Sequence, residues 1–379
     1  MIRRYKKVAV LLLLPIFLTG CWDYKDVNKR DVIISIGVDD VNGEVEITGE
    51  AAKLLSNSSQ QNKGIAQLTE VYKYKSTGKH FEEVRAKYDS NVPFPYFAGA
   101  IRAIVFSKKY AEGGIRAYIN RLYHVAEFRN SVLVSISKES TNDLFSHKIE
   151  NDICIGYAVE DTIKYLDDNG AALYKTVQEV KSDVQFKNIG YLLPYITSEE
   201  NTIKYLGLAA MKDSKLVGII KREESNGFLF VLSKRPVMVN SFPNPSDEKN
   251  LIAIKTTLGK RGIKTNYEDG KINIYIDLKL KSQLQYEYNI EPLSKEDIEK
   301  VENSISDQIK ENIISATKRS QNEFKSDVFG FARYFKAENP KEYKQINWEE
   351  EYPKAVFHVN VDTTILNTNL FDPNAKKTD

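Results

Sequence analysis

Cysteine is scarce in this chain: Cys21 and Cys154 are the only two among 379 residues. Two cysteines cannot build the disulfide framework of a small secreted domain, so the fold must depend on hydrophobic cores. Cys154 stands between Ile153 and Ile155. This apolar setting predicts a small buried side chain and not a reactive thiol.

Long apolar runs are also missing. The apolar run over residues 8–18 is interrupted by Pro15, and it falls short of the about 20 residues that a helix needs to span a bilayer. Basic residues precede the run and small residues follow it. This order is typical of a secretory signal peptide.

The end of this run predicts lipid attachment. Leu18-Thr19-Gly20-Cys21 has the form of a lipoprotein cleavage site. Removal of residues 1–20 as a signal peptide would leave Cys21 as the mature N-terminus, with a diacylglyceride in thioether linkage on its sulfur. The alternative is an ordinary signal peptide, with Cys21 as a core residue. Two acyl chains anchor a protein stably, so we expect contact with membrane lipid through Cys21.

Neither sign of charge dominates. The chain has 54 Lys and Arg against 52 Asp and Glu. Four of the basic residues lie in the leader, so the mature part has 50 against 52 and a net charge of −2. Binding to phosphate backbones requires a marked basic excess, which excludes nucleic acid as the expected partner.

Sequence motifs of catalysis are absent. The four histidines are scattered without metal-ligand spacing: they are His80, His124, His147 and His358. No phosphate-binding glycine loop and no Gly-x-Ser-x-Gly motif occurs. Paired carboxylates such as Glu82-Glu83 are typical of solvated faces. We therefore expect no enzymatic activity, no metal and no cofactor besides the covalent lipid on Cys21.

The length of the chain predicts more than one domain. We expect an N-terminal α/β domain over 21–198 and a small β-rich middle domain over 199–244, with part of 45–77 as a candidate addition to it. A C-terminal domain of sheet and helix should cover 245–370, after the break at Pro243 and Pro245. The fold class is α+β, or mixed α/β: three domains with mixed β-sheets flanked by helices.

Strand and helix patterns alternate in the N-terminal part. Residues 32–39 and 44–48 predict two strands joined by an Asn42-Gly43 turn. A strand over 100–106, a helix over 110–124 and a strand over 131–136 fit a right-handed βαβ crossover. Further expected segments are helices over 157–166 and 172–181, and strands over 205–211, 215–220 and 228–232.

The C-terminal domain has the clearest pattern. Strands are expected over 251–258 and 262–267, and apolar residues at every second position over 272–280 predict a strand with one buried face. Ser294 is a candidate N-terminal cap for a long amphipathic helix that should lie across the sheet. Its apolar stripe is Ile298, Val301, Ile305, Ile309, Ile313 and Ala316. A closing strand is expected over 355–365.

Several short motifs support a resemblance by their order. The chain opens with Gly20-Cys21-Trp22-Asp23, Asp26-Val27-Asn28 and Ile36-Gly37-Val38-Asp39. Three further stretches follow in order. They are residues 104–129, then Lys215-Leu216-Val217-Gly218 with Glu224-Ser225-Asn226-Gly227, and then residues 348–353. In this order they resemble the Ger(x)C family of spore germination lipoproteins, the C subunits of nutrient germinant receptors.

The resemblance implies a function as well as a fold of three mixed α/β domains. Such a protein would be lipid-anchored to the outer face of the spore inner membrane, beside two polytopic membrane subunits of the receptor. It would have no enzymatic activity and would serve the response of a dormant spore to small nutrients. Trp22 and Asp23 are candidates for membrane-proximal placement or partner contact; alternatively, Trp22 only caps the first sheet.

Without the resemblance, the same features also fit a solute-binding lipoprotein that delivers a small ligand to a membrane transporter. That function predicts a preformed cleft between domains, lined by convergent polar groups. An envelope hydrolase is disfavoured because nucleophile motifs are absent.

Overall fold

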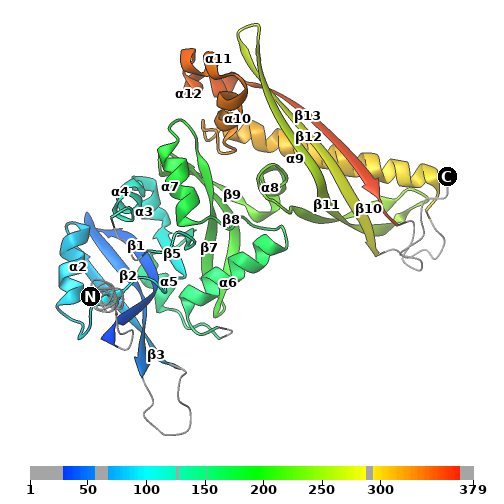
Figure 1. Ribbon diagram of the computed structural model, residues 1–379. Coiled ribbons are helices and arrows are strands. Elements are labelled where there is room, and N and C mark those ends of the chain that lie inside the picture. The colour runs from blue at the N-terminus through cyan, green and yellow to red at the C-terminus, as the bar shows by residue number, and fades with distance from the viewer. Residues whose placement is uncertain (1–28, 56–66, 125–127, 151, 287–292, 368–379) are drawn as a thin grey trace, which may run out of the picture.

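The computed structural model describes residues 29–55, 67–124, 128–150, 152–286 and 293–367. They form two β-sheets flanked by helices (Figure 1). The first sheet has nine strands in the order β3-β2-β1-β5-β6-β7-β8-β9, with β4 beside β1, and the second has the order β10-β11-β12-β13. The expected mixed α+β class is confirmed.

An antiparallel group forms one side of the first sheet. Strands β1 (Asp31–Val41), β2 (Glu44–Leu55) and β3 (Gln67–Gly78) pair in sequence. The turn between β1 and β2 places Asn42 at a φ of 57°, a conformation that asparagine tolerates better than most residues. The predicted hairpin is therefore confirmed.

Parallel strands form the centre of the first sheet. Strand β1 pairs in parallel with β4 (Tyr96–Phe97) and β5 (Ala103–Ser107), and β6 (Leu133–Ser137) and β7 (Tyr191–Glu199) follow. This confirms the βαβ crossover between β5 and β6. The crossover helix is divided into α3 (Lys108–Gly113) and α4 (Arg116–Arg121), because Gly114 has a φ of 118°, which no right-handed helix accommodates.

Helices cover the first sheet. They are α2 (Phe81–Asp89), α5 (Thr141–Ser146), α6 (Ile155–Asp168) and α7 (Val177–Gln185). Helix α7 begins later than the expected residue 172, because Thr176 and Glu179 form a capping box at its start. At the start of α6, the buried Glu50 carboxylate accepts hydrogen bonds from the N–H groups of Ile155 and Gly156.

The strands of the expected middle domain, 199–244, belong to the two sheets. Strands β8 (Thr202–Lys212) and β9 (Lys215–Lys221) extend the first sheet, and β10 (Val237–Asn244) is an edge strand of the second. The expected strand over 228–232 is wrong: after the short 3-10 helix η3 (Arg222–Glu224), this segment lies in helix α8 (Asn226–Leu232). The division into three domains stays a prediction.

The second sheet carries one long helix on its buried face. Strand β11 (Asp247–Glu268) pairs with β12 (Lys271–Tyr286), which pairs in parallel with β13 (Val356–Ile365). The two strands expected over 251–258 and 262–267 are one strand, with an irregularity between Leu258 and Lys260 that absorbs the change of pattern. Helix α9 (Lys295–Asn322) lies across the sheet as predicted (Figure 1), with its apolar stripe buried and Ser294 as its cap.

Short helices complete the C-terminal part: α10 (Phe331–Glu338), α11 (Pro340–Gln345), α12 (Trp348–Glu351) and the 3-10 helix η4 (Tyr352–Lys354). Across the described ranges, no helix has both the length and the apolar character needed to cross a membrane.

Candidate functional site between the two sheets

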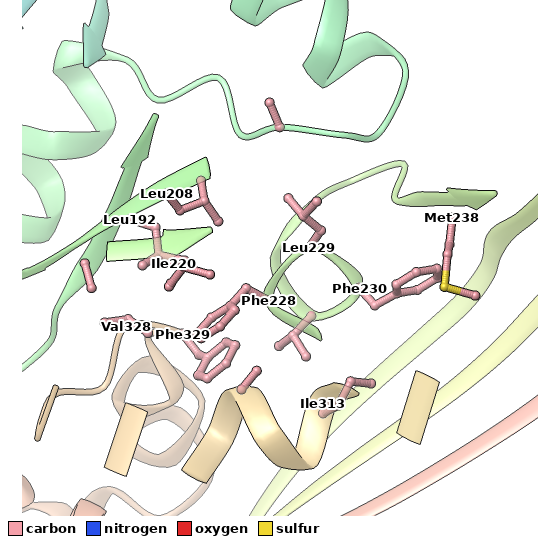
Figure 2. Packing of buried hydrophobic residues seen from close by; sticks show 14 of the residues in the cluster. Leu192, Leu208, Ile220, Phe228, Leu229, Phe230, Met238, Ile313, Val328 and Phe329 are labelled. Atoms are coloured by element: carbon pink, nitrogen blue, oxygen red, sulfur yellow. The ribbon is translucent and has the colours of Figure 1, made fainter. Parts of the chain in front are cut away.

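Helix α8 joins the two sheets through one continuous core. Its residues Gly227, Phe228, Leu229, Phe230 and Val231 are all buried. Figure 2 shows this helix between Leu192, Leu208 and Ile220 of the first sheet and Ile313 of α9. Because α8 is buried on every side, it has no polar face toward solvent. The first sheet and α9 together supply its apolar surroundings.

Two contacts set the position of α8. The Phe228 ring stacks on Phe329, with centroids 5.3 Å apart and an interplanar angle of 9°. A Cβ atom on Gly227 would lie 2.1 Å from the backbone oxygen of Asn312 in α9. Only glycine therefore permits this approach of the two helices.

Asp327 anchors the loop between α9 and α10. Its carboxylate accepts hydrogen bonds from the N–H groups of Phe331 and Ala332, at 3.0 and 2.8 Å, and from Nε1 of Trp348 at 3.2 Å. Complete burial raises the pKa of Asp327 to about 6, since the loss of hydration outweighs these hydrogen bonds. The backbone N–H of Gly190 donates to the carbonyl of Asp327, which ties this loop to the start of β7.

A cleft of about 380 Å³ opens beside this junction. Helices α6 and α7 and strand β7 form one wall, and the segments 232–235 and 328–333 form the other. Its lining is rich in charged residues of both signs: Asp167, Asp168, Lys175, Glu179, Asp183, Lys234, Arg235 and Arg333. The volume is within the range of small-molecule sites.

An ion-pair network spans the cleft. The Asp183 carboxylate, 5% exposed, lies 2.7 Å from Lys175 Nζ and 2.7 Å from an Arg333 guanidinium nitrogen. Arg333 also stacks over the Phe186 ring at 5.1 Å. Since Asp183 belongs to α7 and Arg333 to α10, these contacts hold the walls of the cleft together.

The remaining charges lie closer to solvent. Asp168, Lys234 and Arg235 are exposed, whereas Asp167 is half-buried. Burial raises the pKa of Asp167 against the opposing effect of the Tyr174 N–H that it binds. The cleft therefore offers both anionic and cationic groups, which suits a small polar or zwitterionic molecule. Its lining residues include no histidine and no cysteine, and no metal-binding cluster of three or more such side chains occurs in the described ranges.

The predicted site residues Cys21, Trp22 and Asp23 lie outside the described residues. Cys154 is described, and its predicted burial is confirmed at 7% exposure. Burial raises the pKa of its thiol to about 12, so the thiolate form is suppressed at neutral pH.

Sequence reasoning missed the cleft. The run Asp167-Asp168-Asn169-Gly170 indicated only a break between helices, and Asp183 lies 150 positions from its partner Arg333. The one available signal was the clustering of charges beside a helix break, which is common on solvated surfaces as well.

The motifs behind the family resemblance occupy structural junctions. Asp39 accepts hydrogen bonds from Ser107 Oγ at 2.6 Å and from the Thr141 N–H at 3.1 Å, which ties β1 to the starts of α3 and α5. Glu224 pairs with Arg319 of α9 at 2.7 Å. With Gly227 and Trp348, these contacts hold together elements that are distant in sequence.

Two family models together match most of the chain. The family described as "Spore germination protein N-terminal domain" matches residues 23–198, and "Spore germination B3/ GerAC like, C-terminal" matches residues 206–369. The chain belongs to the Ger(x)C family of spore germination proteins. The predicted resemblance is thus confirmed, and membership assigns the chain a role in spore germination.

Full-length relatives of the Ger(x)C family support the assignment. Spore germination protein YndF of Bacillus subtilis (strain 168) is 21% identical, with 96% of each chain covered. Spore germination protein A3 of the same organism is 23% identical, with 91% of this chain and 93% of the relative covered. The crystal structure of the GerBC protein is similar in fold, with a TM-score of 0.57, 18% identity and coverage of 88% of this chain and 97% of that chain.

Proposed function

We propose that this chain is the lipid-anchored, non-catalytic C subunit of a nutrient germinant receptor. It works on the outer face of the spore inner membrane with polytopic A and B subunits, and Cys21 carries the diacylglyceride. The observation that carries the proposal is the pair of family matches over 23–198 and 206–369, directly after the lipoprotein cleavage site at Gly20-Cys21.

The position of Cys21 limits how far the body can lie from the membrane. Asp31 at the start of β1 follows Cys21 by ten residues, and an extended chain of that length spans at most about 35 Å. The first sheet thus begins close to the lipid, where Trp22 and Asp23 are the residues best placed to contact the bilayer or a membrane subunit. The continuous core at α8 joins the second sheet to the first.

Replacement of Cys21 by serine tests this function. In spores that depend on this chain, we expect Cys21→Ser to abolish labelling by a fatty-acid probe, release the protein from the membrane fraction and lower the germination response to nutrients. Cys154→Ser is the matched control, because Cys154 is buried and has no expected lipid; labelling and germination should persist. Normal germination with an unlabelled, soluble Cys21→Ser protein would contradict the proposal.

The cleft favours a second candidate function, capture of a small polar solute for delivery to a membrane transporter. Thermal unfolding against a panel of amino acids, nucleosides and sugars tests it, since a ligand at 100 times its dissociation constant adds about 2.7 kcal/mol of stability. A reproducible shift that Arg333→Ala removes would show that this chain binds the ligand itself. Loss of solute uptake in growing cells with normal germination would favour the transporter function over the receptor.

A further inference from the structure

The outer face of the second sheet carries a row of lysines. Apolar residues of β12 alternate toward α9, and the residues between them are directed away from it. On this opposite face, five lysines of the central strands are all exposed; they are Lys255, Lys260 and Lys264 of β11 and Lys279 and Lys281 of β12. We call this surface the lysine face.

The register of the strands concentrates this charge. Lys260 lies directly opposite Lys279, and like charges at such cross-strand positions destabilise a sheet. On the same face the acidic residues are Asp277, Asp362 and Glu268, and Glu268 lies opposite a sixth lysine, Lys271, at the end of the strands. The paired outward positions of β11, β12 and β13 therefore carry an excess of three positive charges. Within the described ranges, none of the five lysines forms an ion pair within 4.0 Å.

The charge of the lysine face contrasts with that of the whole chain. Beyond the leader, basic and acidic residues are nearly balanced, so the lysines on this face are an asymmetric feature and not a consequence of composition. A local excess of one sign attracts partners of the opposite sign.

The use of lysine and not arginine indicates the kind of partner that the lysine face binds. The lysine face contains no arginine at its outward positions in β11 and β12; Arg261 is directed to the other side, where it donates to the carbonyls of Phe230 and Ser233. Arginine suits bidentate pairing with a particular carboxylate, whereas lysine is a hydrated point charge without such directionality. Lysines spread over adjacent strands therefore suit a diffuse anionic surface better than a specific acidic site on a protein.

We propose that the lysine face lies against the anionic headgroups of the membrane. Juxtamembrane lysines are attracted to acidic lipids within about a Debye length of the surface. The proposal rests on the proposed function in one respect, because the lipid on Cys21 keeps the body near the bilayer. With two attachments, the lipid and the lysine face, the orientation of the body on the membrane is restricted.

Vesicle binding by the unlipidated chain, residues 22–379, tests the proposal without any contribution from Cys21; this chain retains every described residue. We expect it to sediment with vesicles of phosphatidylcholine and phosphatidylglycerol, not with phosphatidylcholine alone, and to be released by high salt. The variant Lys255→Glu, Lys279→Glu, Lys281→Glu should lose about tenfold or more in affinity.

A second triple variant keeps the net charge matched. Lys164→Glu, Lys310→Glu, Lys318→Glu changes exposed lysines of α6 and α9 and should bind nearly as well as the unchanged chain. The corresponding Lys→Gln variants of the lysine face repeat the test without added negative charge, and circular dichroism checks that each variant is folded.

Three results would overturn the proposal: equal losses in the two triple variants, no preference of the unchanged chain for anionic vesicles, or unaltered vesicle binding by a lysine-face variant that no longer supports germination. The last result would assign the lysine face to an acidic protein partner. Since germination and lipidation do not enter the vesicle assay, failure of the proposed function would be seen separately.

Discussion

Replacing Gly227 with alanine should push helices α8 and α9 apart. The added Cβ would lie 2.1 Å from the Asn312 oxygen and 2.5 Å from its carbonyl carbon, where ordinary contact begins at 3.4 Å. These are backbone atoms of a long helix, so they cannot rotate away. Overpacking costs about 1–3 kcal/mol, and the better helix propensity of alanine offsets about 1 kcal/mol of it. Because the contact is severe, we expect a net loss of about 2 kcal/mol in the free energy of unfolding.

Urea denaturation followed by circular dichroism measures this loss. Gly113→Ala is the matched control: Gly113 ends helix α3, and a Cβ there would meet no atom within 4 Å. Its stability should be unchanged or slightly higher. If the Gly227 and Gly113 variants unfold at the same urea concentration, the close approach of α8 to α9 does not limit the junction, and the reasoning is refuted.

Other buried groups provide three more measurable outcomes. Burial raises the pKa of Asp327 from 3.8 to about 6. The protonated carboxyl therefore adds about 3 kcal/mol to the free energy of unfolding below about pH 4, and this contribution is lost as the pH rises through about 6. Asp327→Asn should remove this part of the pH dependence of unfolding, and an unchanged slope would count against the assignment. Asp183→Asn leaves Lys175 and Arg333 without their counter-charge and should cost about 2 kcal/mol, less than for a fully buried pair because both cations are partly exposed; the exposed Asp168→Asn should have almost no effect in the same denaturation assay, and equal effects would contradict the network. The thiol of Cys154 should resist a maleimide reagent in the folded chain and react on unfolding, because burial raises its pKa to about 12; rapid labelling of the native protein would show that the site opens.

Local chemistry explains what could be predicted from the sequence. The Asn42-Gly43 turn, the cap at Ser294 and the apolar stripe of α9 each depend on residues within a few positions of one another. The βαβ crossover follows from the spacing of apolar segments. The family resemblance rests on short motifs in order, which is also information carried along the chain.

Helix α8 is an element that local sequence patterns could not predict. Phe228-Leu229-Phe230-Val231-Leu232 is apolar throughout, so its period cannot distinguish a buried strand from a buried helix. The choice is made by its neighbours: Gly227 fits against α9, and Phe228 stacks on Phe329. Strand β11 is a similar case, because its continuity depends on pairing with β12 across the irregularity at Leu258.

The sequence by itself determined the mixed α+β class, the amphipathic helix on the second sheet and the family, and it predicts the leader with its lipidation motif. Only the tertiary structure decided the cleft, the ion pairs of Asp183 and the lysine face. Asp183 and Arg333 are 150 positions apart, and Lys260 meets Lys279 only through the strand register. Such neighbours are set by the packing of whole elements, and that packing is a property of the folded chain and not of any segment within it.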